Sequence, residues 1–438
     1  MWQHKFLSKD CRSYKVGSVN QVTSPLDAKR NLFRLGLICL PFVPAVGLVS
    51  LVSSITLVTL ATKRYKVLVA NSLLGRATFF IGLLLIFSCW VADNKAEAFL
   101  QLVNFLPLFW LFATLPYLLK TFVQIEQLTA DLVIISIPIS VIAIIEFLLS
   151  GARSTSTFTN PNFLAGYSVV ILGIELGLLL KALSRPKSSL FLNFNLERRN
   201  DNDFQLNSLI VFLLICLTFA AILTSGSRSG LIIALLQIIS FVIINYLFIK
   251  YNLIVVFGSL GCLFTLACAT WTWFEASRRL LLSSLFSDLR VEIWRVAILL
   301  IRQRPLFGWG LGNFRILYPL HSRTSEHFSH AHNFWLQLGS EGGIPVILGL
   351  SALTAYIYYK STKFLLVHQQ RLSEHSILIG YLLGFSGCTL YALFDCPFYA
   401  VQVNVTNWVT LGVIHILTEP SFSYKQAEPH LRALRDRS

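Results

Sequence analysis

The stretch SLIVFLLICLTFAAILT-SGSRS-GLIIALLQIISFVIINYLFI, residues 208–249, decides the class of this fold. Two apolar runs, 208–224 and 230–249, flank a short polar turn, and Arg228 in that turn is the single charged residue of the stretch. Each run approaches the length of about 20 apolar residues with which a helix crosses a bilayer. The stretch therefore predicts two transmembrane helices joined by a tight turn.

The composition extends this interpretation to the whole chain. Of 438 residues, 55% are hydrophobic and only 13% are charged, whereas soluble domains carry roughly a quarter charged residues. This composition argues against a soluble enzyme, a disordered protein and a nucleic-acid-binding domain. The formal net charge of +15 first calls for a topological explanation, because cytoplasmic loops of membrane proteins collect Lys and Arg.

We predict an all-α polytopic membrane protein with about twelve transmembrane helices and one long periplasmic loop that carries amphipathic helices. The first two spans are predicted as a hairpin of short helices, because Pro41 and Pro44 would break one long helix and basic residues flank both ends. The twelve predicted spans are 33–43, 45–61, 77–92, 99–119, 128–149, 163–180, 208–224, 230–249, 252–272, 333–357, 376–394 and 400–417.

The distribution of Lys and Arg predicts the orientation of these spans. With the N-terminus in the cytoplasm, the basic residues concentrate in the cytoplasmic segments, as the positive-inside rule requires. The expected organisation is a cytoplasmic basic tail (1–32), helices one to nine (33–272), a periplasmic loop (273–331), helices ten to twelve (332–417) and a cytoplasmic C-terminal tail (418–438). This topology predicts a multi-pass membrane protein with both termini in the cytoplasm.

The 273–331 loop is basic although it is predicted to lie outside. It contains no lysine, and long loops cross the membrane largely regardless of charge. Guanidinium groups bind phosphate at two points, which an ammonium group does not, so the preference for arginine favours an anion site; a basic loop resting on anionic headgroups is the alternative. The arginines are Arg278, Arg279, Arg290, Arg295, Arg302, Arg304, Arg315 and Arg323, and His321, His327, His330 and His332 lie in or beside the loop.

Helical periodicity continues inside this loop. Over 288–303, apolar residues recur on one face, and Pro305 ends the pattern. This predicts an amphipathic helix on the outer surface of the bundle. The following glycines, 308–312, have neither a preceding strand nor a Lys-Ser/Thr pair, so they predict a turn rather than a phosphate-binding loop.

Three places put polar groups where a membrane bundle disfavours them. Arg228 lies among small residues in the outward turn, which suggests an inward-facing anion site or an arginine that reaches the headgroups. Arg290 and Trp294 are one turn apart on the amphipathic helix. The third place is the segment from His330 to Gln337, where the chain re-enters the membrane; it also contains His332 and Asn333.

A histidine beside two or three arginines could both bind an anion and accept a proton. The arginines can hold a diphosphate and neutralise the charge that develops as it leaves, while a histidine can take a proton from an attacking hydroxyl. This combination predicts glycosyl transfer from a lipid-diphosphate donor. We expect neither a metal nor a cofactor, because no cysteine or carboxylate pattern completes a metal site, and the loop offers no pair of carboxylates as glycosidases use.

At these residues the sequence resembles the O-antigen ligase family, whose superfamily also contains the O-antigen polymerases. The similar stretches follow one another in the family's order over about 160–345. They are Thr159-Asn-Pro-Asn162-Phe-Leu-Ala165, Ser225-Gly-Ser-Arg228-Ser-Gly230, Arg290 through Trp294, Arg304-Pro-Leu-Phe-Gly308-Trp-Gly-Leu-Gly-Asn313, His332-Asn-Phe-Trp-Leu-Gln337 and Glu341-Gly-Gly-Ile344.

The resemblance implies a metal-independent membrane glycosyltransferase that works at the periplasmic face. Its donor would be a glycan on undecaprenyl diphosphate, and its acceptor would be the lipid A-core in a ligase or another lipid-linked repeat in a polymerase. Carried over by motif, Arg228 and Arg290 would grip the diphosphate and His332 would be the base, with His330 as the alternative base. The other expected substrate contacts are His330, Asn333, Arg153, Asn162, Trp294 and Gln337.

Alternatives remain at this stage. Ligation to lipid A-core is the leading expectation, and an O-antigen or exopolysaccharide polymerase is the alternative within the superfamily. A transporter for an anion or a lipid-linked sugar is the competing class, although such proteins usually contain internal repeats, and a structural membrane subunit is a third. The stretch Asp395-Cys-Pro-Phe-Tyr399 predicts a turn that could also close the site, and helix capping explains Asn162 as well as a substrate contact does.

Overall fold

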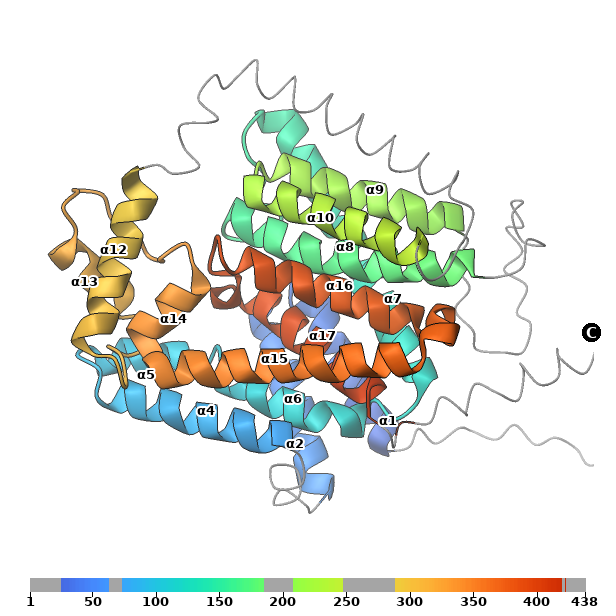
Figure 1. Ribbon diagram of the computed structural model, residues 1–438, viewed down its shortest axis with the longest axis horizontal. Coiled ribbons are helices and arrows are strands. Elements are labelled where there is room, and N and C mark those ends of the chain that lie inside the picture. The colour runs from blue at the N-terminus through green and yellow to red at the C-terminus, as the bar shows by residue number, and fades with distance from the viewer. Residues whose placement is uncertain (1–24, 63–72, 185–207, 247–287, 420–421, 423–438) are drawn as a thin grey trace, which may run out of the picture.

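The computed structural model describes residues 25–62, 73–184, 208–246, 288–419 and 422, and within these ranges the regular structure is helical, without a strand (Figure 1). The helices form a bundle, with a group of shorter helices at one end. They are α1 (Pro25–Cys39), α2 (Pro44–Thr62), α4 (Leu73–Trp90), α5 (Lys95–Leu102), α6 (Leu106–Leu118), α7 (Phe122–Ser150), α8 (Pro161–Leu183), α9 (Ser208–Thr224), α10 (Arg228–Ile244), α12 (Asp288–Gln303), α13 (Phe314–His321), α14 (Phe334–Gly342), α15 (Ile344–Val367), η3 (Gln369–His375), α16 (Ser376–Tyr391), η4 (Pro397–Tyr399) and α17 (Val401–Leu417).

The helices have the length and composition of a membrane protein. Among the described residues, five segments are long and apolar enough to cross a bilayer: Pro44–Ala61, Leu73–Trp90, Lys95–Leu118, Phe122–Ser150 and Pro161–Leu183. Three shorter helices, α9, α10 and α17, are also apolar. The prediction of a helical membrane protein is confirmed. The count of twelve spans stays a prediction, and the predicted span 252–272 lies outside the described residues.

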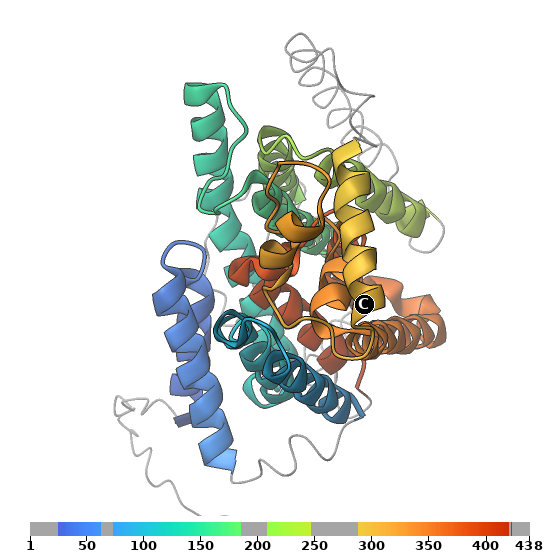
Figure 2. The same cartoon turned by 90° about the vertical axis from the view of Figure 1, so that its left-hand side faces the viewer.

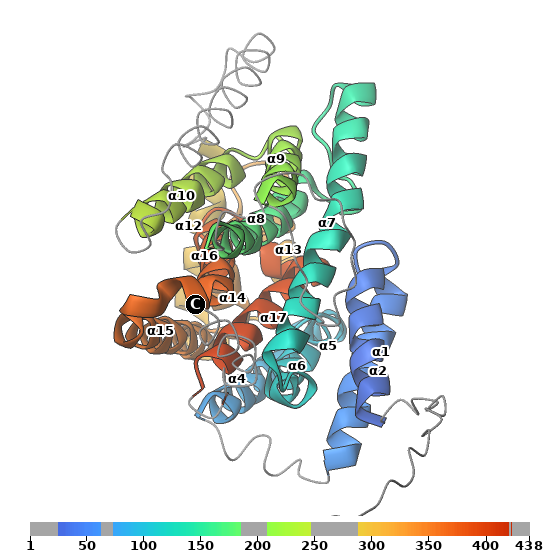
Figure 3. The ribbon, with the colours of Figure 1, turned by 90° about the vertical axis from the view of Figure 1, so that its right-hand side faces the viewer.

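Helix α8 is the centre of the bundle. It is buried on every side and packs against α16, α9, α10, α17 and α7 (Figure 3). Its closest neighbour is α16, because glycines face each other across the contact: a Cβ atom on Gly173 would lie 2.1 Å from the backbone of Gly384, and one on Gly177 would lie 2.4 Å from Gly380. Small residues at such positions let two membrane helices pack backbone to backbone.

The N-terminal hairpin forms as two helices, as the proline pair predicts. α1 ends at Cys39 and α2 begins at Pro44, so the break falls at the expected place. α1 starts at Pro25, within the segment predicted as a polar tail. Arg34 of α1 donates two hydrogen bonds, of 2.5 and 2.8 Å, to the carboxylate of Asp131 on α7, which anchors the hairpin to the bundle.

The predicted single span 333–357 is wrong in its continuity. The segment forms two helices, α14 and α15, because Gly343 between them takes a positive φ of 84°. A Cβ atom at Gly343 would lie 2.4 Å from the carbonyl oxygen of Leu306, so only glycine fits there. The predicted span 99–119 lies within the segment Lys95–Leu118, which is long and apolar enough to cross a bilayer, although residues 103–105 divide it into α5 and α6.

The amphipathic helix predicted over 288–303 is confirmed as α12. Its apolar face, including Ile293 and Leu300, is buried against Phe314 and Tyr318 of α13. α12, α13 and α14 lie together at the left-hand end of the bundle in Figure 1, and Figure 2 views that end directly. This group of helices covers the end at which the candidate site lies.

The predicted glycine turn docks this group onto the α4–α5 corner. Gly308, Gly310 and Gly312 all have positive φ angles, and a Cβ atom at Gly310 would lie 2.3 Å from Ala92. Beside the turn, ion pairs join Arg304 to Asp93 and Arg315 to Glu97. The glycines therefore let this turn pack closely against its neighbours.

Candidate functional site

Three arginines that are far apart in the sequence line one cavity of about 260 Å³. Arg153 comes from the loop before α8, Arg228 from the first turn of α10 and Arg290 from the first turn of α12. The backbone of Gly226 and the hydroxyl-bearing Ser227 and Ser229 complete the polar part of its wall, and Asn162 lies at one side. Guanidinium groups and hydroxyls suit an anion such as phosphate.

The SGSRS turn builds one wall of this cavity. Gly226 takes a φ of 61°, and Ser227 then caps α10 by accepting a hydrogen bond of 3.3 Å from the N–H of Gly230. Arg228 is thus the first residue of a helix whose N-terminal end lines the cavity, where the helix dipole favours negative charge. A Cβ atom at Gly226 would lie 3.0 Å from Cγ of Arg153, so glycine lets that arginine lie across the turn.

A buried tyrosine holds the turn to two other helices. The hydroxyl of Tyr391, at the end of α16, donates 2.9 Å to the carbonyl oxygen of Asn162 and lies 3.0 Å from the hydroxyl of Ser227. Tyr391 is fully buried. One side chain of α16 therefore fixes the start of α8 relative to the start of α10.

A chain of polar contacts leads from the cavity to His332. Arg153 Nη2 donates 2.6 Å to Asn162 Oδ1, and Asn162 Nδ2 donates 2.6 Å to Asp395 Oδ2. The other carboxylate oxygen of Asp395 lies 3.6 Å from His332 Nδ1, a distance within reach of an ion pair but longer than a hydrogen bond. The amide of Asn162 thus joins a cavity arginine to the partner of the histidine.

Asp395 is held in its charged form. Burial alone would raise its pKa, but His332, the N–H of Cys396 and the amide of Asn162 outweigh burial, so the pKa lies below its ordinary value. An ionised carboxylate facing Nδ1 favours the tautomer with the proton on Nδ1 and leaves Nε2 as the basic nitrogen. His332 also takes a φ of 47°, which is uncommon for a residue other than glycine.

His330 has a different environment from His332. Its ring packs against Tyr399, with centroids 5.2 Å apart, and against Phe163 at 6.4 Å. Burial lowers the pKa of His330 to about 4; Asp395 opposes this shift, and His332 and Arg315 add to it. His330 is therefore neutral at physiological pH.

A buried network fixes the backbone between the two histidines. The N–H of Ala331 donates 2.6 Å to Gln337 Oε1, and Gln337 Nε2 donates 2.7 Å to the carboxylate of Glu341. The indole N–H of Trp294 donates 3.1 Å to the carbonyl oxygen of Ala331. Asn333 caps α14, accepting from the N–H of Leu336 at 3.0 Å.

The structure therefore distributes the residues singled out in the sequence between two places. Arg153, Asn162, Arg228 and Arg290 line the cavity, and His332 is tied to Asn162 through Asp395. The remaining ones, His330, Trp294, Asn333 and Gln337, lie in and around the histidine segment. Sequence reasoning gave Ser227 and Tyr391 no role of their own, and it connected Asp395 to the site only as part of a turn that could close it; the fold brings this carboxylate to the histidine.

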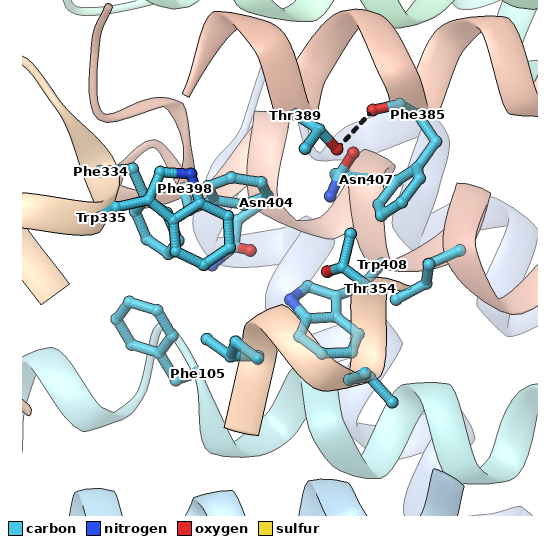
Figure 4. Close-up of a pocket in the computed structure, with 13 residues that line it drawn as sticks. Phe105, Phe334, Trp335, Thr354, Phe385, Thr389, Phe398, Asn404, Asn407 and Trp408 are labelled. Atoms are coloured by element: carbon cyan, nitrogen blue, oxygen red, sulfur yellow. Dashed lines mark hydrogen bonds between the residues drawn. The ribbon is translucent and has the colours of Figure 1, made fainter. Parts of the chain in front are cut away.

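A second cavity lies beside α14, lined by α14, α15, α16 and α17, and has a different character (Figure 4). It is mostly apolar, with Trp335 and Trp408 among its lining residues. Two buried asparagines of α17, Asn404 and Asn407, line it, and their side-chain oxygens have no protein partner. Its free volume of about 40 Å³ suits a few water molecules rather than a charged ligand.

The described part of the chain gathers no group of three or more His, Cys, Asp or Glu side chains of the kind that binds a metal ion. The chemistry near the cavity is that of guanidinium, hydroxyl, amide, carboxylate and imidazole groups. Such a set can bind an anion and move a proton.

Comparison with known proteins gives a family match over part of the chain. Residues 211–351 match the O-antigen ligase family, a segment that includes Arg228, Arg290 and both histidines of the site. No curated protein matches the chain. Residues 211–351, about a third of the chain, are therefore similar to the O-antigen ligase family.

Proposed function

We propose that this protein transfers a glycan from an undecaprenyl-diphosphate donor to an acceptor hydroxyl, at the periplasmic face of the inner membrane. The convergence of Arg153, Arg228 and Arg290 on one cavity, with His332 linked to its wall, carries the proposal. The similarity of residues 211–351 to the O-antigen ligase family supports a lipid-linked glycan as substrate. Ligation to lipid A-core is the reaction we favour.

The cavity arginines bind the diphosphate of the donor. Three guanidinium groups can neutralise the negative charge that grows on the diphosphate as its bond to the sugar breaks, and the N-terminal end of α10 adds to the favourable field. Since these groups come from three separate segments, the folded bundle preorganises them. Charge stabilisation of this kind lowers the barrier without a metal.

His332 is the base. Its Nε2 accepts the proton of the acceptor hydroxyl, whose oxygen forms the new bond to the anomeric carbon. The bond between that carbon and the diphosphate oxygen breaks, and its electron pair leaves with the diphosphate. The carboxylate of Asp395, 3.6 Å from Nδ1, stabilises the imidazolium that results, as a buried carboxylate does in other histidine-dependent sites.

The remaining predicted residues position the histidine segment without contacting the substrate. Gln337 and Trp294 hold Ala331, and Asn333 starts α14 directly after His332. We assign these three to positioning of the histidine segment. His330 is neutral and packs on Tyr399. It lies in the same segment and is the alternative base.

The test uses the full-length protein in membranes of a strain that lacks its gene. We expect Arg228→Ala, Arg290→Ala and His332→Ala to accumulate to normal levels but to abolish glycan transfer, whereas Arg302→Ala, an exposed arginine of the same helix α12, keeps it. Full activity in all three site variants would refute the proposal.

The deletion strain itself separates the two reactions of the superfamily. Long glycan chains that accumulate on the lipid carrier, with none attached to the cell surface, indicate a ligase. Surface glycan that consists of single repeats indicates a polymerase. Unchanged surface glycan together with a changed distribution of an anion across the membrane favours a transporter.

A further inference from the structure

The side chain of Asn162 lies between two groups of opposite charge. Its carbonyl oxygen accepts 2.6 Å from the guanidinium of Arg153, and its amide nitrogen donates 2.6 Å to the carboxylate of Asp395. Its own backbone N–H donates 2.8 Å to the side chain of Asn160, which caps α8. Both ends of the amide and its backbone are therefore fixed.

The neighbouring charges determine which way the amide points. A guanidinium only donates hydrogen bonds and a carboxylate only accepts them, so a flipped amide would face a donor with a donor and an acceptor with an acceptor. An amide satisfies both partners in a single orientation. A leucine of similar size would satisfy neither, and an aspartate would face Asp395 with like charge.

Each bond of Asn162 fixes a group that the proposed reaction needs. On one side, Arg153 is held at two points, by Asn162 and by the carbonyl oxygen of Ser225 at 2.8 Å, which sets the plane of its guanidinium at the cavity. On the other side, Asp395 is buried, and its second oxygen faces His332. The side chain of Asn162 therefore orients both Arg153 and Asp395.

We propose that Asn162 is a positioning residue that couples the diphosphate cavity to the base, holding Arg153 for the donor and Asp395 for His332 at the same time. This inference rests on the proposed glycosyl transfer. It differs from a substrate contact because Asn162 acts through its two neighbours. It predicts that one substitution disturbs both donor affinity and turnover.

The first variant, Asn162→Leu, removes both hydrogen bonds. We expect the KM for the lipid-diphosphate-linked donor to rise and kcat to fall, each by about tenfold or more. Each of the two lost hydrogen bonds has a charged partner, and the loss of one such bond is enough for a tenfold change. By contrast, Asp395→Asn should lower kcat with little change in KM. Protein level and elution from a sizing column serve as the folding check.

The second variant, Asn162→Asp, places a carboxylate beside Asp395. The titratable and charged groups around this pair are His332 and His330 from the segment before α14, Arg153 from the loop before α8 and Tyr391 from α16. Added negative charge favours protonated imidazole. The acidic limb of the pH–rate profile should therefore move to higher pH, by about one unit or more.

Asn160→Asp is the matched control. It introduces the same charge two residues away, and aspartate caps a helix as well as asparagine does. Both aspartate variants keep a favourable acidic group at the start of α8, so this comparison remains informative even if Asn162→Leu does not fold. The control should leave the pH profile in place.

The results separate this inference from the function on which it rests. Wild-type KM, kcat and pH profile in Asn162→Asp, or an equal shift in Asn160→Asp, would overturn the coupling role while Arg228→Ala and His332→Ala still abolish transfer. Transfer that survives those two substitutions overturns the proposed function instead. A shifted acidic limb in Asn162→Asp alone supports the coupling.

Discussion

Replacing Asp395 by asparagine removes one charge from a buried position and little else. The carboxylate accepts from Asn162 at 2.6 Å and from the N–H of Cys396 at 2.7 Å, and it faces His332 Nδ1 at 3.6 Å. An asparagine has nearly the same shape and can keep one acceptor oxygen. The variant therefore measures what the negative charge does for the imidazolium that forms during transfer.

The distance sets the size of the effect. Two unit charges 3.6 Å apart interact by about 4 to 5 kcal/mol at an effective dielectric constant of about 20. His332 is 26% exposed, so water screens part of this, and about 2 to 3 kcal/mol should remain. At 1.36 kcal/mol per factor of ten, Asp395→Asn should lower kcat by about 30- to 200-fold.

The assay is glycan transfer by the purified full-length protein with saturating lipid-linked donor. Asp93→Asn is the control, because Asp93 is half exposed and pairs with Arg304 away from the cavity; it should change kcat by less than about twofold. A loss below threefold in Asp395→Asn, with the protein folded, would refute the electrostatic role of this carboxylate.

Three further predictions concern stability. Burial holds the pKa of His330 at about 4 in the folded protein, below the value of about 6.5 in the unfolded chain, so between these values the unfolded chain binds more protons at this residue. His330 should therefore lower the free energy of unfolding by about 2 kcal/mol from pH 8 to pH 5, and His330→Phe should remove this part of the pH dependence in thermal unfolding followed by tryptophan fluorescence. Gly308→Ala should cost more than Gly151→Ala in the same assay: both have positive φ, worth about 1 to 2 kcal/mol, but only Gly308 would also meet a backbone, at 2.4 Å. Gln337→Leu should lower the free energy of unfolding by about 1 to 3 kcal/mol because the N–H of Ala331 would lose its partner, and equal melting temperatures for variant and wild type would contradict this.

Much of the fold follows from local pattern. Apolar runs such as 208–224 and the apolar face of 288–303 predict their helices, because length and periodicity are properties of the segment itself. The break at Gly343 does not follow from these patterns, since an isolated glycine inside an apolar run is tolerated in most helices. It becomes necessary only because the backbone of Leu306 lies against it.

The site is predictable in its residues more than in its connections. Arg228, Arg290 and His332 stand out because charge and imidazole are unusual beside membrane helices. The role of Asp395 is invisible in the sequence: it depends on the antiparallel contact of α8 and α16, which places it beside Asn162. A pairing between residues more than two hundred positions apart is a property of the packed bundle.

The glycine contact between α8 and α16 bears on more than packing. Gly166 meets Tyr391, Gly173 meets Gly384 and Gly177 meets Gly380, all in one antiparallel register that ends at Asn162 and Asp395. If the two helices slid by a single turn, about 5.4 Å, the amide and the carboxylate would no longer touch. A bulky side chain at Gly173 or Gly177, several helical turns from Asn162, would then abolish the proposed glycan transfer, because it would push α8 and α16 out of register and separate Asn162 from Asp395.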